Sequence, residues 1–245
     1  MINLTRKKKQ EKRKAYTNSN IFIKLIFFFY MKLIDSYRKM KEGKTFDEYG
    51  LTMYCGRQGA GKTIAMTDYL ERMREKYPNA LIITNYGYKY QNGEMKDWED
   101  FFSIRNGTDG VIFAIDEIQN EFSSAAWNKF PESLLSEITQ QRKQRVKIVC
   151  TSQIYTRVVK QLREQCNDVV ECNTFGGRWT FTRCYDAVDY NNVIDRPTAR
   201  ENIRRLYTRS FLQDDYIRNC FDTYQKIEKM QQTEYLGKSE RAKVS

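Results

Sequence analysis

The sequence has 245 residues, of which 40% are hydrophobic and 30% charged, with a formal net charge of +11. These values fit one folded α/β domain with modest appendages and exclude a predominantly disordered or low-complexity chain. The sequence contains no histidine, which excludes Ser-His-Asp triads, histidine general bases and zinc sites that need imidazole. Its six cysteines form no CxxC pair, so we expect reduced, buried thiols in a cytoplasmic protein.

The first 20 residues form a basic arm, with seven Lys or Arg side chains against one Glu. This arm suits nucleic acid or an anionic membrane surface, although a solvated tail has the same composition. Residues 21–34 are strongly apolar, but Lys24 and Lys32 interrupt them, and a membrane-spanning helix needs about 20 apolar residues. Three interpretations stay open: a short or interfacial membrane anchor, a helix packed on the domain or a neighbouring subunit, or a segment upstream of a natural start at Met31.

From residue 51 onward, apolar runs alternate with segments of helical periodicity, which predicts a mostly parallel sheet covered on both faces. The expected strands are 51–55, 80–84, 111–115, 146–151 and 169–172, with a hairpin partner at 179–186. The expected helices are 63–76, a short one near 98–104, 132–145 and 156–166. Residues 198–236 are expected to be largely helical or irregular. The chain is thus divided into an N-terminal arm and apolar segment (1–49), a core (50–190) and a C-terminal extension (191–245).

A glycine-rich loop connects the first expected strand to the first expected helix and matches the pattern G-x-x-x-x-G-K-[ST]. In this pattern the glycines let successive backbone N–H groups converge on one anion, and the following helix adds its positive end. The lysine reaches the β- and γ-phosphates of a nucleotide, and the hydroxyl ligates Mg²⁺. We therefore predict that ATP and Mg²⁺ bind at Gly56, Arg57, Gln58, Gly59, Ala60, Gly61, Lys62, Thr63 and Ile64.

Two acids follow the apolar run at 111–115. A carboxylate at the carboxyl end of a strand beside a phosphate loop is well placed to hold hydrated magnesium, and Asp116 takes this position. Glu117 can then orient and deprotonate the attacking water. An apolar run that ends in Asp-Glu is a weak signal alone, but it becomes specific when a complete phosphate loop accompanies it.

The strand at 146–151 supplies the third group of candidates, because it runs into Thr-Ser-Gln beside the loop. Gln153 is the candidate sensor of the γ-phosphate, with Ser152 next. Arg142 precedes this strand, where a basic side chain can project into a neighbouring subunit's site as an arginine finger. A solvated basic helix end explains Arg142 equally well.

Together these elements resemble the FtsK/HerA branch of P-loop motors, and within it the zonular occludens toxin (Zot) domain shared with assembly ATPases of filamentous phages. The resemblance covers about residues 50–185 and implies an ASCE/RecA-like P-loop NTPase fold. Such a fold has five mostly parallel strands in the order 5-1-4-3-2, flanked by helices, plus a hairpin and a C-terminal helical extension. The residues that carry the resemblance are Lys62 and Thr63 in the loop, Asp116, Glu117 and Gln119 after the buried strand, Arg142 as the finger-like arginine and Gln153 as the sensor.

Two departures from the family pattern stand out. The family often has Gly three residues after the finger-like arginine, where this sequence has Arg145. The phage proteins typically continue into a membrane span, and no such apolar run follows here on the C-terminal side. Nothing in the sequence supports a toxin role.

The sequence therefore predicts a Mg-dependent ATPase, a homo-oligomeric ring with a hexamer as one candidate, that translocates DNA or drives phage or mobile-element assembly. Nucleic acid is the expected partner, and membrane association through residues 1–34 would place the protein in the cytoplasm at the inner face of the cell membrane. The alternative is a nucleotide-gated, membrane-associated scaffold that does little mechanical work. A small-molecule kinase fits less well, because no Arg-rich lid segment is evident.

Overall fold

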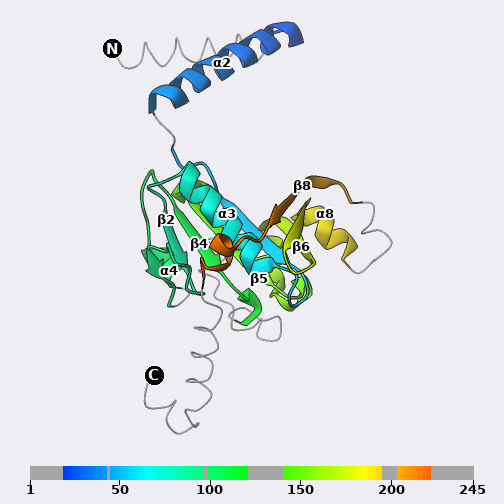
Figure 1. The fold of residues 1–245 in the computed structure, drawn as a ribbon. Helices are drawn as coiled ribbons and strands as arrows, with labels where there is room; N and C mark the ends of the chain where they lie inside the picture. Colours follow the sequence, from blue (N-terminus) through cyan, green and yellow to red (C-terminus); the bar gives the residue numbers. More distant parts are fainter. Residues whose placement is uncertain (1–18, 43–44, 97–98, 121–140, 195–202, 222–245) are drawn as a thin grey trace. The chain divides into compact units, whose positions relative to one another are not determined.

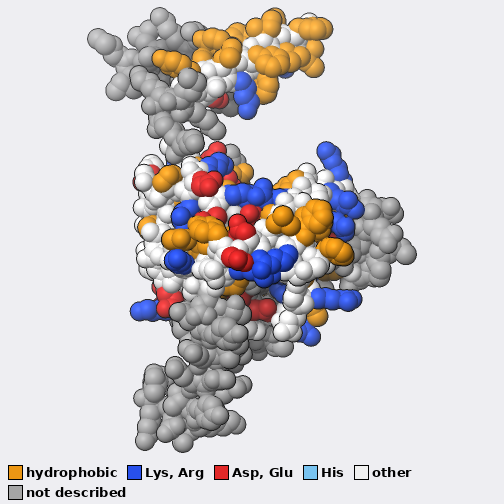
Figure 2. Space-filling model, viewed as in Figure 1, with side chains coloured by type: hydrophobic (Ala, Val, Ile, Leu, Met, Phe, Trp, Pro, Cys, Tyr) orange, Lys and Arg blue, Asp and Glu red, His pale blue; other side chains and the backbone are white. Residues whose placement is uncertain are grey.

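The structure is a computed structural model that describes residues 19–42, 45–96, 99–120, 141–194 and 203–221. The chain divides into two compact units, residues 1–45 and 46–245, and each is described by itself. In the first unit, helix α2 spans Ile21–Glu42. Its apolar side chains are largely solvent-exposed, and Figure 2 shows them (orange) over much of the visible face of α2. Among the described residues, no helix combines the length and the apolarity that a membrane crossing requires.

The second unit is built on one mixed sheet of eight strands in the order β3-β2-β4-β5-β1-β6-β7-β8. Figure 1 shows this sheet, with β2, β4, β5, β6 and β8 labelled. The strands from β3 to β6 run parallel to their neighbours, and β7 and β8 are antiparallel additions. In chain order the strands are β1 (Gly50–Cys55), β2 (Leu81–Thr84), β3 (Gly93–Glu94), β4 (Val111–Ile115), β5 (Val146–Ser152), β6 (Cys166–Phe175), β7 (Trp179–Asp186) and β8 (Arg205–Leu212).

Short helices and one long helix connect these strands. The α-helices are α3 (Lys62–Lys76), α4 (Asp100–Ser103), α6 (Gln141–Gln144), α7 (Lys160–Glu164), α8 (Ala187–Val193) and α10 (Asp215–Arg218). The 3₁₀ turns are η1 (Ile118–Asn120) and η3 (Tyr155–Arg157). Helix α3 packs across β1 and β5 on one face of the sheet (Figure 1).

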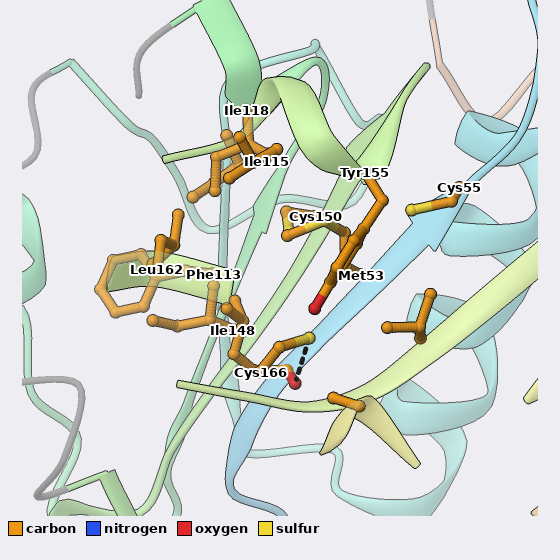
Figure 3. Packing of buried hydrophobic residues seen from close by; sticks show 14 of the residues in the cluster. Met53, Cys55, Phe113, Ile115, Ile118, Ile148, Cys150, Tyr155, Leu162 and Cys166 are labelled. Carbon is orange, nitrogen blue, oxygen red and sulfur yellow. Dashed lines mark hydrogen bonds between the residues drawn. The ribbon is translucent and has the colours of Figure 1, made fainter. Parts of the chain in front are cut away.

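The core has two layers because the parallel strands are buried on both faces, as their continuous apolar sequences require. In β4, Val111, Phe113 and Ile115 belong to one apolar cluster, whereas Ile112 and Ala114 belong to the other. The second cluster includes the buried side of α3, with Met66, Leu70 and Met73. Figure 3 shows the first cluster, in which side chains of β1, β4 and β5 pack with Tyr155 and Leu162 from the segment after β5.

The prediction of a five-stranded sheet was wrong in its strand count and in the resulting order. The five expected strands keep the neighbours β6-β1-β5-β4-β2, but the sheet continues beyond them at both edges and becomes mixed. At one edge β3 adds two residues beside the end of β2. At the other edge β7, expected as a hairpin partner, carries β8 on its far side.

Two other expectations need correction. Residues 205–212 were expected to be helical or irregular, but they form β8, because the open edge of β7 offers backbone partners that local helical preference does not outweigh. The helix expected at 156–166 is divided into η3 and α7, since Val158 and Val159 between them are extended and buried in the core. The predicted helix 132–145 lies mostly outside the described residues, and only its end is seen as α6.

All six cysteines are buried as thiols and not as disulfides, as expected from the sequence. Burial raises the pKa of Cys166 and of Cys172 to about 12 and that of Cys184 to about 11. These thiols therefore act as apolar core groups.

Candidate nucleotide site

The glycine-rich loop lies between the end of β1 and the start of α3, where the sequence predicts it. Gly61 has φ 85°, a left-handed conformation that favours glycine. A Cβ atom at Gly61 would lie 2.4 Å from the Thr174 hydroxyl oxygen, and one at Gly56 would lie 2.9 Å from the Cys172 carbonyl oxygen. The hairpin formed by β6 and β7 therefore packs so closely on the loop that a side chain does not fit at either position.

The Lys62 side chain is held in place by a backbone carbonyl of the glycine-rich loop. Its Nζ donates to the Arg57 carbonyl oxygen at 3.3 Å and lies 4.0 Å from Glu117 Oε1, and the side chain is almost fully buried. A buried ammonium group next to the N-terminus of the 15-residue helix α3 gives the loop a positive field that suits phosphate.

Asp116 and Thr63 meet across the sheet from segments 53 residues apart in the sequence. Thr63 Oγ1 donates to Asp116 Oδ1 at 2.8 Å, and Thr151 Oγ1 donates to the same oxygen at 2.7 Å. Asn85 fixes the backbone at this point, because its Oδ1 accepts from the Asp116 N–H at 2.7 Å and its Nδ2 donates to the Asp116 carbonyl oxygen at 3.2 Å. Two side chains therefore orient the carboxylate, and a third side chain fixes the backbone that carries it.

Glu117 has a left-handed backbone, with φ 56°, which is uncommon for a residue with a side chain. Its N–H donates to Thr151 Oγ1 at 2.9 Å, and this bond helps to hold the conformation. Both carboxylate oxygens of Glu117 accept hydrogen bonds: Gln153 Nε2 donates to Oε1 at 3.4 Å, and Gln119 Nε2 donates to Oε2. The turn points this second acid toward Lys62 and the loop.

The structure therefore brings together Lys62, Thr63, Asp116, Glu117 and Gln153, as the sequence analysis predicted, at the carboxyl ends of β1, β4 and β5. Ligands bind at this edge of open parallel sheets. A hydroxyl and a carboxylate oxygen are the hard oxygen donors that Mg²⁺ prefers, so Thr63 and Asp116 fit a magnesium ion shared with a phosphate.

Ser152, the second candidate after Gln153, is turned away from this group. Its hydroxyl donates to the Ile154 carbonyl oxygen at 2.9 Å and closes the turn after β5. Arg142 lies within α6, but its side chain lies outside the part that the structure describes.

Arg145, the departure from the family pattern, adopts φ 57° at the turn between α6 and β5. The turn therefore needs the left-handed conformation that glycine would supply without strain. Arg145 instead donates from Nη1 to the Phe46 carbonyl oxygen at 3.1 Å and to the Thr108 carbonyl oxygen at 3.0 Å. These bonds offset the strain and tie three segments together at the amino ends of β4 and β5.

Asn85 and Thr151 are site residues that the sequence analysis missed. Asn85 directly follows β2, which ends at Thr84, and Thr151 is the second-last residue of β5. The same position at the end of a buried strand suggested Asp116. A polar residue at the carboxyl end of each predicted parallel strand was therefore the available clue.

A chain of polar groups supports the loop from behind. Thr174 Oγ1 bonds to the Ala60 carbonyl oxygen at 3.0 Å and to Thr180 Oγ1 at 2.9 Å. Gln213, just after β8, donates to Thr180 Oγ1 at 2.7 Å and is itself buried. The added strands β7 and β8 are thereby connected through hydrogen bonds to the phosphate-binding loop.

The parallel sheet, the loop between β1 and α3 and the two acids after β4 define the class: this domain has the fold of a P-loop NTPase. The sequence model of the zonular occludens toxin (Zot) family matches residues 66–199, which is more than half of the chain. The chain therefore belongs to the Zot family. A comparison with curated protein sequences found no match.

Among solved structures, the N-terminal domain of zonular occludens toxin from Neisseria meningitidis is similar, with a TM-score of 0.53 and 14% identity, over 71% of this chain and 99% of that one. The genome packaging NTPase B204 from Sulfolobus turreted icosahedral virus 2, in complex with AMPPCP, has a TM-score of 0.46 and 12% identity, over 68% and 97%. The cytoplasmic domain of the Thermomonospora curvata type VII secretion ATPase EccC has a TM-score of 0.43 and 12% identity, over 69% and 24%.

Proposed function

We propose that the protein is a Mg-dependent ATPase that acts as an oligomeric motor in DNA translocation or in phage or mobile-element assembly. The observation that carries this proposal is the meeting of Lys62, Thr63, Asp116 and Glu117 at one edge of the sheet, with Lys62 Nζ 4.0 Å from the Glu117 carboxylate. Membership of the Zot family supports the motor part of the proposal.

Each side chain has a distinct role in this mechanism. Lys62 neutralises the β- and γ-phosphates, a task that suits an ammonium group already buried in the loop. Thr63 and Asp116 hold Mg²⁺, which when bound neutralises charge on the transferred phosphoryl group. Glu117 accepts a proton from the attacking water, and Gln153, bonded to its Oε1, keeps that oxygen in place and senses the γ-phosphate.

The formal charge of +11 supports nucleic acid as the partner that is moved, because phosphate contacts supply most of the sequence-independent affinity for DNA. In the motor, Arg142 completes the site of a neighbouring subunit. α6 lies at the amino end of β5, whereas the candidate site of the same subunit lies at its carboxyl end, and this separation supports a role in a neighbouring subunit.

The test is ATP hydrolysis by the full chain, measured with Mg²⁺, with EDTA, and with single- or double-stranded DNA. Lys62→Ala should lower the rate by about a hundredfold or more, as expected when a group that stabilises developing phosphate charge is removed. Lys160→Ala is the matched control, because Lys160 is exposed and pairs only weakly with Glu164 at 3.6 Å. Normal turnover by Lys62→Ala would rule out an ATPase at this site, and turnover that DNA does not change would argue against a DNA motor.

The exposed apolar side chains of α2, which follow the basic arm, favour a second candidate: a membrane-associated scaffold whose assembly ATP controls. In that case Lys62→Ala and Glu117→Gln would change the oligomeric state, measured by sedimentation with and without ATP. The wild-type hydrolysis rate would then be low and insensitive to DNA.

A further inference from the structure

A cavity of about 950 Å³ lies directly beside the phosphate loop. Gly56, Arg57 and Ala60 of the loop form one wall, and Gln153 after β5 forms another. The cavity therefore adjoins the carboxylate site, because Gln153 also bonds to Glu117. None of the residues assigned so far explains why it extends to the opposite side, over β6 and β7.

That opposite side is an aromatic surface made by Phe175, Trp179 and Phe181. Phe175 and Trp179 face each other across the hairpin, and the rings of Trp179 and Phe181 lie 4.8 Å apart with an interplanar angle of 37°. Phe175 is 73% exposed and Trp179 45% exposed.

The alternation of β7 produces this surface. Thr180 and Thr182 point to the opposite side and are buried, so Trp179, Phe181 and Arg183 all line the cavity. Two large aromatic rings at this cavity stay exposed to solvent and so contribute little buried apolar area to the core. Exposed apolar surface beside a cavity is typical of a ligand-binding site.

The sheet order gives the direction in which a bound nucleotide must run. Asp116 and Glu117 follow β4, which is separated from β1 by β5. In the proposed site these acids mark the side of the phosphate loop where the γ-phosphate and Mg²⁺ would bind. On the other side of β1 lies β6, followed by β7. A triphosphate that passes over the loop from the acids therefore brings its nucleoside to the side of β6 and β7, where the aromatic surface lies.

We propose that Phe175, Trp179 and Phe181 form the subsite for the base of the nucleotide, with the base stacked on Trp179. This inference rests on the proposed nucleotide-binding function and adds to it the residues that recognise the nucleoside. Aromatic rings stack on a base at little conformational cost. Arg183, on the same face of β7, also lines the cavity. Its guanidinium N–H groups can donate to acceptor atoms of the base or the ribose.

The experiment compares two ligands that share the phosphates but not the base. Binding of β,γ-methylene ATP and of inorganic triphosphate, both with Mg²⁺, is measured by calorimetry on the full chain. Stacking on one aromatic ring contributes about 1–3 kcal/mol, so Trp179→Ala should weaken β,γ-methylene ATP by roughly 5- to 150-fold. The affinity for inorganic triphosphate should stay within about twofold, because the loop that holds it is intact. Trp179→Phe keeps an aromatic ring and should retain most of the affinity.

Leu212→Ala is the matched control. Leu212 pairs with Trp179 across β7 and β8 and is exposed, but it does not line the cavity. It should therefore leave both affinities unchanged and should show what the mere loss of an exposed apolar side chain on this sheet does.

The outcomes separate this inference from the proposed function. If the wild-type protein binds neither ligand, the nucleotide site itself is wrong. If the wild-type protein binds both ligands, the two variants Trp179→Ala and Phe181→Ala become decisive. Variants that bind β,γ-methylene ATP as tightly as the wild-type protein would show that the base subsite is wrong. Equal loss of both ligands would mean that Trp179 only supports the loop. If Trp179→Ala loses affinity for oligo(dT) but binds nucleotide unchanged, the aromatic surface binds single-stranded DNA instead. Either this result or an equal loss of both ligands would overturn the proposal.

Discussion

The left-handed backbone of Glu117 is the clearest sign that two adjacent acids have been given different directions. A side chain in this conformation costs roughly 1–2 kcal/mol, and such strain collects at functional sites. The hydrogen bond from the Glu117 N–H to Thr151 offsets part of that cost. As a result, Asp116 faces Thr63, whereas Glu117 faces Lys62 and Gln153.

This geometry predicts different effects for the two amides. Glu117→Gln keeps the shape and the bond to Gln153 but cannot accept a proton, so ATP should bind normally while hydrolysis falls by about a hundredfold or more. Asp116→Asn should instead weaken the Mg²⁺ dependence of binding, because it removes the charge that Thr63 and Thr151 now surround. Nucleotide affinity at several Mg²⁺ concentrations and single-turnover rates separate the two effects. Loss of binding in Glu117→Gln together with full turnover in Asp116→Asn would mean that the two roles are reversed.

Arg145 allows a test of conformational strain at a single residue. Arg145→Ala keeps the left-handed backbone but loses the hydrogen bonds to Phe46 and Thr108, which should lower the free energy of unfolding by about 2–3 kcal/mol. Arg145→Gly loses the same bonds but relieves the strain, so it should be more stable than Arg145→Ala by about 1 kcal/mol. Urea unfolding measures both values. A glycine variant less stable than the alanine variant would show that the φ of Arg145 costs little.

At the scale of elements, the added strands β7 and β8 shape the nucleotide site. The hairpin tip packs on the phosphate loop through Thr174 and Thr180, and Gln213 after β8 holds both hydroxyls. The loop is therefore supported by elements that lie on the far side of β1 from Asp116 and Glu117.

Gly61→Ala tests this support. The new Cβ would lie 2.4 Å from Thr174 Oγ1 in a backbone with φ 85°, so the hairpin or the loop must shift. Gly107→Ala is the control, since Gly107 also has positive φ (52°) but meets nothing within 4 Å. We expect Gly107→Ala to cost about 1 kcal/mol of stability. Gly61→Ala should cost more and also weaken the binding of inorganic triphosphate. Equal costs with unchanged triphosphate binding would show that the hairpin does not position the loop.

The basic arm is the second element whose role is open to a direct test. If residues 1–20 contact phosphates, their deletion should lower the affinity for DNA or for anionic liposomes. It should also flatten the dependence of that affinity on salt, because fewer counterions are released. Binding is measured at several salt concentrations, with neutral liposomes as the control. Unchanged salt slopes for DNA and for anionic liposomes would leave the arm as a solvated tail.

At the scale of the whole molecule, the proposed motor depends on more than one copy of the chain. Arg142→Ala should bind ATP normally but hydrolyse it on the order of a thousandfold more slowly, because an arginine finger acts on charge that develops in the transition state. Mixing Arg142→Ala with Lys62→Ala should restore activity, since each protein keeps the part that the other lacks. No recovery at any mixing ratio, or a protein that stays monomeric with ATP, would contradict a shared site.

Much of this fold follows from the sequence for a physical reason. Strands buried on both faces need continuous apolar runs, so β4 has the bounds that the pattern predicts, and the loop motif places α3 within one residue. β7 also has its predicted bounds, because it follows the Gly176-Gly177 turn of a hairpin. β8 was not predictable in the same way. Its sequence, RLYTRSFL, is mostly exposed in the structure, and its strand conformation depends on the edge of β7 that lies beside it only in the folded chain.

The candidate site likewise has residues that the sequence predicts and residues that depend on the folded arrangement. Residue types and spacing predicted a site at Lys62, Thr63, Asp116, Glu117 and Gln153, and the structure brings these side chains together. Asn85 and Thr151 were open to prediction as polar residues at strand ends, but their bonds to Asp116 depend on the order of the strands in the sheet. The aromatic cavity over β6 and β7 was missed because it belongs to a hairpin face that carries no motif.

The burial of all six cysteines makes the protein suited to fluorescence work on its assembly. Thiols whose pKa burial raises to about 11 or 12, as for Cys184 and Cys166, carry almost no thiolate near neutral pH and react slowly with maleimide dyes. A single cysteine introduced at Val188, which is 66% exposed on α8, would therefore take up the dye well before the native six. Energy transfer between donor- and acceptor-labelled chains can then test whether the proposed ring forms, in a protein that keeps every native cysteine.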